Sequence, residues 1–235
     1  MTLRTIFLDA GGVLVYPSWT RISAALAVRG VHVDPDVLAR AEPHAKRQLD
    51  VAETINATSD AGRGWLYFNL LFERAGVPID SSVESALEEL RAYHNENNLW
   101  EFVPPTVFPA LAALRERGLK VTIVSNSNGK LRVLFDRLKL SGCVDCLLDS
   151  DVEGIEKPDP RFFELALARS GARKETTIHV GDLYHVDVVG ARNAGLRAVL
   201  LDEAGLYLEA DCPRVRSITE LATRIEAGEF GTVGS

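Results

Sequence analysis

The sequence has little cysteine and no long apolar run, and each absence excludes a class of protein. Three cysteines, Cys143, Cys146 and Cys212, are too few for a disulfide framework, and their odd number leaves at least one thiol free. No window of 18 apolar residues exists, and Asp9 interrupts the first apolar run after six residues. Neither a membrane span nor a secretory signal is therefore expected, and we predict a protein of the reducing cytoplasm.

Nucleotide-binding loops and an excess of positive charge are also missing. Without G-x-x-x-x-G-K-[ST] or G-x-G-x-x-G, the usual signatures of nucleotide-loop kinases and dinucleotide oxidoreductases are absent. The formal net charge of −7 disfavours non-specific binding to nucleic acid or to anionic membranes. The single Cys143-x-x-Cys146 pair offers only two of the four ligands of a structural zinc site. We expect neither a nucleic-acid nor a membrane partner, and a monomer or homodimer.

What the sequence does contain is an alternation of strands and helices. Apolar, β-prone runs that end in small or polar residues are predicted as strands at Leu3–Leu8, Lys120–Val124, Cys146–Leu148, Thr177–Val180 and Arg197–Leu201. Helices are predicted at Pro109–Arg117, Leu131–Leu138, Pro160–Ser170 and Val186–Ala194. This order predicts an α/β fold with a doubly wound, mainly parallel sheet, whose ligands bind at the carboxyl ends of the strands.

A long helical insertion separates the first predicted strand from the second. Its predicted helices are Trp19–Val28, Asp36–Val51, Gly64–Ala75 and Ser81–His94. We therefore predict a discontinuous core domain of residues 1–15 and 99–235 and a helical cap domain of residues 16–98, placed over the site that Asp9 marks. The aromatic side chains of this insertion are assigned to its own core rather than to a substrate surface: Trp19, Trp65, Tyr67 and Phe68.

Aspartates at two strand ends predict a site for a hard metal ion. Asp9 follows the first strand and precedes two glycines, while Asp182 follows a later strand and Asp187 lies five residues beyond it. Carboxylates brought together repel one another unless a cation neutralises them. Mg²⁺ is typically bound by one or two carboxylates together with water and phosphate oxygens. The pattern therefore predicts a Mg²⁺ site.

Polar residues at two further strand ends are suited to a phosphoryl group. Ser125 and Asn126 offer a hydroxyl, an amide and backbone N–H groups. In Lys157-Pro158-Asp159-Pro160, the first proline favours an extended backbone at Lys157, and Asp159 suits the N-cap of the next helix. This geometry can hold the Lys157 ammonium toward the same edge of the sheet.

The motifs in this order resemble the haloacid dehalogenase-like (HAD) superfamily, in its phosphatase-like branch with a helical C1-type cap and a Rossmann-type core. The resemblance runs from about Leu3 to Leu201. It rests on Phe7-Leu8-Asp9-Ala10-Gly11-Gly12-Val13-Leu14, Ile123-Val124-Ser125-Asn126, Lys157-Pro158-Asp159-Pro160, and His179-Val180-Gly181-Asp182 with Asp187.

The resemblance implies a Mg²⁺-dependent hydrolase of a small phosphorylated metabolite that acts through an aspartyl-phosphate. Asp9 is the implied nucleophile, with Ser125 and Lys157 as the other catalytic residues. The implied metal ligands are Asp9, the Gly11 carbonyl, Asp182 and Asp187. The residues implied to bind the phosphoryl oxygens are Gly12, Ser125, Asn126 and Lys157.

One position departs from the phosphatase pattern. Gly11 stands where phosphatases of the superfamily usually carry the aspartate that protonates the leaving group, and a glycine does no acid–base chemistry. Three explanations stay open: another residue relays the proton, the leaving group needs no acid, or the protein binds a phosphorylated ligand with little or no turnover. The candidate relays are His32, Glu42, His44, Glu53 and His185.

Two relatives without that aspartate remain as alternatives. Haloacid dehalogenases resemble the pattern but carry an aromatic residue at this position and use no metal, which fits Gly11, Asp182 and Asp187 poorly. Phosphonate-cleaving members use a cap lysine as a Schiff base, a role that only Lys46 can fill here. Lys46, followed by Arg47 on an amphipathic helix, is expected on a solvated face instead.

Overall fold

The computed structural model describes residues 2–233, and the chain separates into two compact units. We call Met1–Tyr16 together with Val103–Ser235 the α/β unit, and Pro17–Phe102 the helical unit. The chain thus passes between the units at 16–17 and 102–103, compared with the predicted 15–16 and 98–99.

A six-stranded parallel sheet forms the centre of the α/β unit. Its strands lie in the order β4 (Cys146–Asp149), β3 (Lys120–Ser125), β2 (Thr5–Leu8), β5 (Thr177–Gly181), β6 (Arg197–Leu201) and β7 (Arg214–Val215). Leu8 at the end of β2 pairs with Ile123 of β3 and with Val180 of β5. The chain winds outward from β2 in both directions, so the ends of β2 and β5 flank the switch point where such sheets bind ligands.

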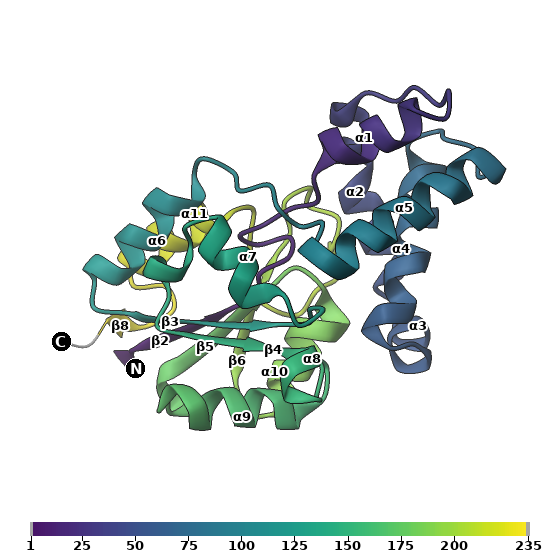
Figure 1. The fold of residues 1–235 in the computed structure, drawn as a ribbon. Helices are drawn as coiled ribbons and strands as arrows, with labels where there is room; N and C mark the ends of the chain where they lie inside the picture. Colours follow the sequence, from purple (N-terminus) through teal and green to yellow (C-terminus); the bar gives the residue numbers. More distant parts are fainter. Residues whose placement is uncertain (1, 234–235) are drawn as a thin grey trace. The chain divides into compact units, whose positions relative to one another are not determined.

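Helices cover both faces of this sheet. Figure 1 shows α6 (Val107–Glu116), α7 (Leu131–Arg137) and α11 (Ile218–Glu226) on one face, with α9 (Pro160–Ser170) and α10 (Gly190–Asn193) on the other. Because both faces are covered, all four residues of β2 are buried, and the strand is a continuous apolar run rather than an alternating one. The predicted doubly wound parallel sheet is confirmed.

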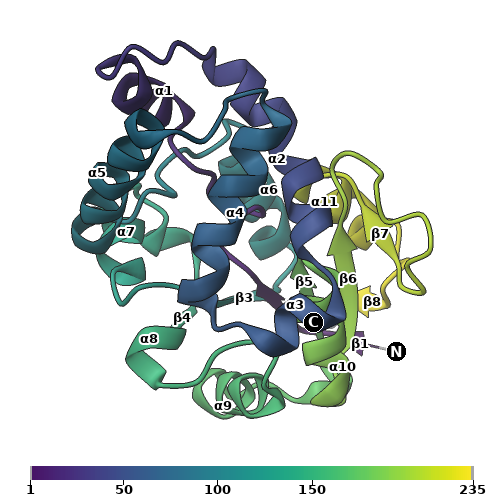
Figure 2. The same cartoon turned by 90° about the vertical axis from the view of Figure 1, so that its right-hand side faces the viewer.

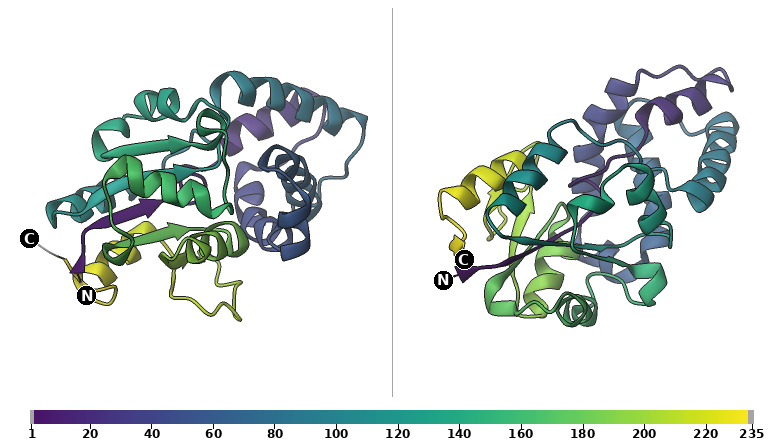
Figure 3. Two further views of the ribbon diagram at one scale, coloured as in Figure 1. Left: turned by 90° about the horizontal axis from the view of Figure 1, so that it is seen from below. Right: turned by 60° about the vertical axis from the view of Figure 1, so that its left-hand side comes forward.

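Several short elements of the α/β unit were not predicted. These are β1 (Thr2–Leu3) and β8 (Thr232–Val233), which pair in parallel, β7, α11, α8 (Ser150–Glu153), and the 3₁₀ turns η1 (Ser141–Cys143) and η2 (Lys174–Thr176). Strands of two residues are too short to show a period, and only their partners define them. In Figure 3 (right), the yellow helix α11 runs beside the teal helix α6, which it contacts.

The predicted helix Val186–Ala194 is wrong in its form. The chain instead makes a π-helical segment, η3 (Tyr184–Val189), followed by the short helix α10. The Asp187 carboxylate lies inside this turn, where Oδ2 accepts a hydrogen bond from the Leu183 N–H at 3.1 Å. The backbone widens around a side chain that faces the sheet, and π-turns of this kind are frequent at functional sites.

The helical unit consists of α1 (Trp19–Ala27), α2 (Pro35–Leu49), α3 (Ala52–Ala57), α4 (Asp60–Arg74) and α5 (Ser81–Asn97). Figure 2 shows α2 alongside α4, and these helices share the largest contact within the unit. Helix α3 was not predicted, and α4 begins earlier than predicted because Ser59 caps it, accepting from the Gly62 N–H at 3.3 Å. No helix within residues 2–233 has the length and apolar character needed to cross a bilayer.

Aromatic side chains contribute to the core of the helical unit, as predicted. Tyr67 is buried, with Trp19 and Phe68 packed against the same cluster. The Tyr67 and Phe68 rings meet edge to face, with their centroids 5.1 Å apart. The Trp65 side chain lies outside the described part of the structure.

Candidate active site

Asp9 is held at the end of β2 by the backbone around it. Its N–H donates to the Val180 carbonyl at 2.9 Å, which extends the pairing with β5 by one residue. Its Oδ1 accepts from the Ala10 N–H at 2.7 Å. The chain then turns through Gly12, whose φ of 69° is the left-handed conformation that glycine adopts without strain. The carboxylate, 14% exposed, is therefore fixed at the carboxyl edge of the sheet.

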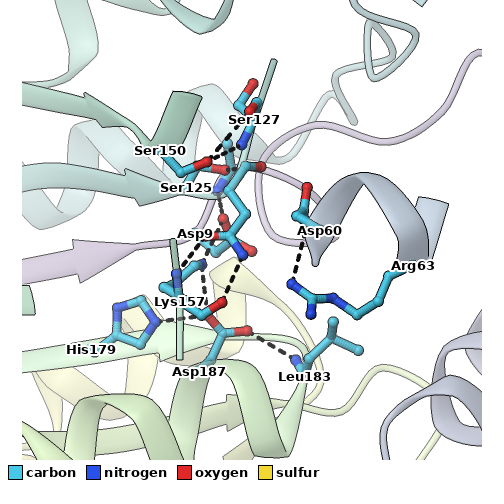
Figure 4. Close-up of polar contacts among 12 residues, drawn as sticks. Asp9, Asp60, Arg63, Ser125, Ser127, Ser150, Lys157, His179, Leu183 and Asp187 are labelled. Carbon is cyan, nitrogen blue, oxygen red and sulfur yellow. Dashed lines mark hydrogen bonds and ion pairs between the residues drawn. The ribbon is translucent and has the colours of Figure 1, made fainter. Parts of the chain in front are cut away.

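Lys157 lies fully buried between two carboxylates. Its Nζ is 3.0 Å from Asp9 Oδ1 and 2.7 Å from Asp187 Oδ1 (Figure 4). Burial alone would lower the pKa of this ammonium, but Asp187 and Asp9 outweigh it and raise the pKa above its usual value. Lys157 is thus a permanent cation shared by side chains from two different elements.

The Asn126 side chain holds the backbone of Lys157 in place. Asn126 Oδ1 accepts from the Lys157 N–H at 2.8 Å, and Asn126 Nδ2 donates to the Lys157 carbonyl at 2.9 Å. The sequence analysis expected this amide to face phosphoryl oxygens, but the reciprocal pair uses it to join the ends of two segments. The part assigned to the Asn126 backbone N–H stays a prediction.

The loop after β3 is fastened to β4 by a buried carboxylate that the sequence analysis missed. Asp149 accepts from the N–H groups of Gly129 and Leu131, each at 3.1 Å. Next to it, Ser150 Oγ accepts from the Ser127 N–H at 3.0 Å (Figure 4). The sequence contains one indication of this role, because Asp149 directly follows the predicted strand Cys146–Leu148. These bonds fix the loop that begins at Ser125.

The three aspartates predicted to bind metal do lie together. One carboxylate oxygen from each of Asp9, Asp182 and Asp187 lies within 4.8 Å of the others. Asp182 is 6% exposed and Asp187 is fully buried. Gly181 makes the arrangement possible, because a Cβ at this position would overlap the Asp187 carboxylate.

The three clustered carboxylates of Asp9, Asp182 and Asp187 carry more negative charge than the Lys157 ammonium neutralises. Burial, helped by the carboxylates of Asp187 and Asp182, raises the pKa of Asp9 to about 7 against the lowering effect of Lys157. For Asp187 the attraction of Lys157 and the hydrogen bond from His179 outweigh burial, so its pKa lies below its usual value. Three carboxylates around one ammonium are a donor set of hard oxygens that fits a divalent cation such as Mg²⁺.

The remaining predicted ligand-binding positions are Gly11 and Gly12, in the turn after Asp9. Gly12 N–H donates to the Val15 carbonyl at 2.9 Å, and the Gly12 carbonyl accepts from the Tyr16 hydroxyl at 3.0 Å. The Gly12 N–H therefore has to leave Val15 before it can bind a phosphoryl oxygen. The roles of Gly11 and Gly12 stay predictions.

The helical unit contains most of the candidate proton relays. His32, His44 and Glu53 are exposed, whereas Glu42 is 3% exposed and pairs with Lys46 at 3.0 Å. The expectation of a solvated Lys46 is wrong, because its side chain is only 14% exposed and faces this buried carboxylate. A Schiff-base role for Lys46 would require the pair to break.

His185 is the candidate relay that belongs to the same unit as Asp9. It lies on η3, and its ring meets the ring of Tyr184 edge to face at 5.2 Å. The Tyr184 hydroxyl donates to Asp211 Oδ1 at 2.7 Å. This contact orients the Tyr184 ring against which His185 rests.

Comparison with known sequences gives a consistent result. The family of haloacid dehalogenase-like hydrolases matches residues 3–195. A phosphoserine phosphatase of Thermus thermophilus is 34% identical over 64% of this chain and 58% of its own. A glyceraldehyde 3-phosphate phosphatase of Pyrococcus abyssi is 30% identical over 57% and 56%. The chain spans less than two thirds of the length of these curated relatives.

Comparison with solved structures agrees at the level of the fold. A HAD-hydrolase of Bacillus subtilis, solved with magnesium, superposes with a TM-score of 0.69 at 17% identity and covers 96% of this chain and 99% of its own. A HAD phosphatase of Thermococcus onnurineus gives a TM-score of 0.57 at 21% identity, covering 95% and 98%.

Proposed function

The chain belongs to the haloacid dehalogenase-like hydrolase family, and on this premise we propose that it is a Mg²⁺-dependent phosphatase of a small phosphorylated metabolite. The observation that carries the proposal is the position of Lys157 Nζ, 3.0 Å from Asp9 and 2.7 Å from Asp187, beside a third carboxylate. Relatives named as phosphatases support the same reaction class. The free thiols of the described residues support a cytoplasmic setting.

The reaction begins with Asp9. Its carboxylate attacks phosphorus in line, the bond from phosphorus to the leaving oxygen breaks, and an aspartyl-phosphate forms. Water then attacks the phosphorus, which releases inorganic phosphate and regenerates Asp9. Phosphoryl transfer needs positioning and charge neutralisation more than covalent chemistry, which matches a site built from fixed charges.

The other residues hold charge in place during these steps. Lys157 offsets the negative charge of Asp9 and of the phosphoryl oxygens, and the Ser125 hydroxyl with the Asn126 N–H binds those oxygens. Bound Mg²⁺ supplies further charge neutralisation, and its proposed ligands are Asp9, the Gly11 carbonyl and Asp182. Asp187 already accepts three hydrogen bonds, and we place it in support of the water shell of the ion.

A direct test measures phosphate release. Purified protein is assayed with a panel of phosphomonoesters and Mg²⁺, then with EDTA, and with Asp9→Asn. We expect the substitution to reduce turnover by about a thousandfold or more, because it removes the nucleophile. The matched control is Asp136→Asn, an exposed aspartate on α7 of the same unit, which should retain activity. Turnover that is indifferent to both Asp9 and metal would overturn the mechanism.

A second experiment tests the consequence of Gly11 for the departure of the leaving group. Without a general acid at that position, the rate should depend steeply on leaving-group basicity, so that acyl phosphates or sugar 1-phosphates react faster than simple alkyl esters. The measurement is kcat/KM over a series of esters whose leaving groups differ in pKa. A flat series would show that another residue supplies the proton.

The same glycine motivates one other function, a protein that binds phosphorylated ligands with little turnover. In that case beryllofluoride, which mimics a phosphoryl group on an aspartate, should bind in the presence of Mg²⁺ while a broad panel of phosphate esters is left intact. Multiple turnovers on any ester of the panel would exclude this alternative.

A further inference from the structure

A histidine lies buried in the middle of β5, where the other side chains are apolar or small. His179 is inaccessible to solvent, and its ring meets the Phe163 ring edge to face with centroids 4.9 Å apart. In the sheet it sits between Phe7 of β2 and Ala198 of β6. Burying an imidazole in such surroundings is unfavourable unless its polar atoms are bonded.

One nitrogen of this ring contacts the candidate site. His179 Nε2 is 2.9 Å from Asp187 Oδ1, whereas Nδ1 has no hydrogen-bond partner among residues 2–233. A protonated ring would bury an N–H group without an acceptor. The contacts therefore favour the neutral tautomer that carries its proton on Nε2 and donates it to the carboxylate.

On one face of β5, Gly181 leaves space for the Asp187 carboxylate and His179 provides a hydrogen-bond donor to it. Side chains alternate along β5, so His179 and Gly181 point to one side of the sheet. Gly181 leaves room for the carboxylate, since a Cβ there would overlap it, and His179 provides a hydrogen bond at its edge. Asp187 Oδ1 then accepts from both His179 and Lys157, while Oδ2 accepts from the Leu183 N–H.

We propose that His179 is a positioning residue of the phosphatase site: its Nε2–H fixes Asp187 Oδ1, which in turn holds Lys157 Nζ beside Asp9. The proposal rests on the proposed function. It explains why a polar ring occupies a core position that a leucine of similar size would fill without an unbonded nitrogen. Substitution of a residue that orients the groups around a metal site typically lowers activity or metal affinity by about 10- to 100-fold.

The test compares variants that separate the hydrogen bond from packing. His179→Leu removes the donor and keeps most of the volume, while His179→Gln places an amide N–H near the position of Nε2. The control is Thr122→Val, because Thr122 lies in the same row of the sheet, on the other side of Phe7, and its buried hydroxyl has no partner in the described chain.

For His179→Leu we expect kcat to fall about 10- to 100-fold with KM changed by no more than about threefold, because Lys157 is displaced while the Ser125 hydroxyl and the Asn126 N–H, the other groups proposed to bind the phosphoryl oxygens, remain. His179→Gln should regain most of the lost kcat, and Thr122→Val should match the parent protein. Equal losses in the Leu and Gln variants, or losses that follow the unfolding midpoint in all three, would overturn the proposal in favour of a packing role.

Two readouts do not depend on turnover. In ¹⁵N-labelled, metal-free protein, the His179 ring should show a protonated Nε2 and an unprotonated Nδ1, and the opposite tautomer would contradict the proposal. In calorimetry with Mg²⁺ and beryllofluoride, His179→Leu should bind at least about tenfold more weakly than the parent. If the parent hydrolyses no ester, the proposed function fails, and unchanged beryllofluoride affinity in His179→Leu would then overturn the role of His179 separately.

Discussion

Each unit contains a lysine withdrawn from solvent, and the two lysines are held in different ways. Lys46 of the helical unit is 14% exposed and pairs with Glu42, one turn earlier on the same helix. Lys157 of the α/β unit is fully buried and contacts Asp9 after β2 and Asp187 on η3. The Glu42–Lys46 contact lies within one helix, whereas the contacts of Lys157 join segments that are far apart in the sequence.

The difference distinguishes an ion pair within one helix from a lysine that belongs to the candidate active site. An i,i+4 pair such as Glu42–Lys46 follows from helical spacing alone. Lys157 faces a cluster that contains more carboxylates than it can neutralise, and such an imbalance favours binding of a further cation. Substitution of the two lysines is therefore expected to have opposite results: mainly a loss of activity at Lys157 and mainly a loss of stability at Lys46.

The largest effect is expected for Lys157→Met. Removal of the ammonium leaves Asp9 and Asp187 without their shared counter-charge, and it removes a group that we propose to stabilise the transition state. We expect kcat/KM for the preferred ester to fall by about a thousandfold, measured on protein whose fold is verified by circular dichroism. A loss below about tenfold would indicate that Lys157, like Lys46, has a structural role rather than a catalytic one.

Gly181→Ala should reduce stability as well as activity. The added methyl group would overlap the Asp187 carboxylate, which is fully buried and held by three hydrogen bonds. We expect a loss of about 3 kcal/mol or more in the free energy of unfolding, measured by urea denaturation. Gly142→Ala is the matched control, since an added Cβ there meets nothing within 4 Å, and similar losses for both variants would contradict the explanation.

Metal affinity should depend on pH through Asp9. Its pKa is raised to about 7 in the metal-free protein, so below that pH a proton competes with Mg²⁺ for the carboxylate. The apparent Kd for Mg²⁺ should rise about tenfold between pH 8 and pH 6 and change little above pH 8. Calorimetric titration at several pH values measures this, and a Kd that is constant or smaller at pH 6 would contradict it.

The smallest effect on activity is expected for Lys46→Met. Turnover should stay within about twofold, while the free energy of unfolding falls by about 1–3 kcal/mol because the buried Glu42 carboxylate loses its ion pair with Lys46. Thermal denaturation and the phosphatase assay measure the two quantities. A complete loss of turnover, or trapping of Lys46 by borohydride in the presence of a phosphonate substrate, would instead support the phosphonatase alternative.

The central fold was predictable because its determinants are local. Each long strand is an apolar run that ends at a polar residue, and a parallel sheet brings such ends to one edge. This is why the sequence alone predicts Asp9, Ser125 and Asp182 at that edge. The N-cap of α9 was also predictable, because Asp159 directly precedes Pro160. In the structure the Asp159 side chain accepts from the Arg161 N–H at 2.9 Å.

The connections between those ends were not predictable from local pattern. Asn126 has the appearance of a turn residue in the sequence, and its clamp on Lys157 depends on two loops that only the folded sheet brings together. His179 gave a weaker signal: it is a polar residue inside an apolar run, two positions before Gly181. Its partner Asp187 sits in a π-helical turn that a regular helical period does not describe.

The insertion of the helical unit has a practical consequence at Ser18 and Leu99. The Ser18 N–H donates to the Leu99 carbonyl at 2.9 Å, so the incoming and outgoing chains lie side by side at the base of this unit. A module with adjacent ends can be excised or exchanged through a single narrow junction. We expect a chimera joined at this junction to keep the β2–β3 pairing while it receives a foreign insert.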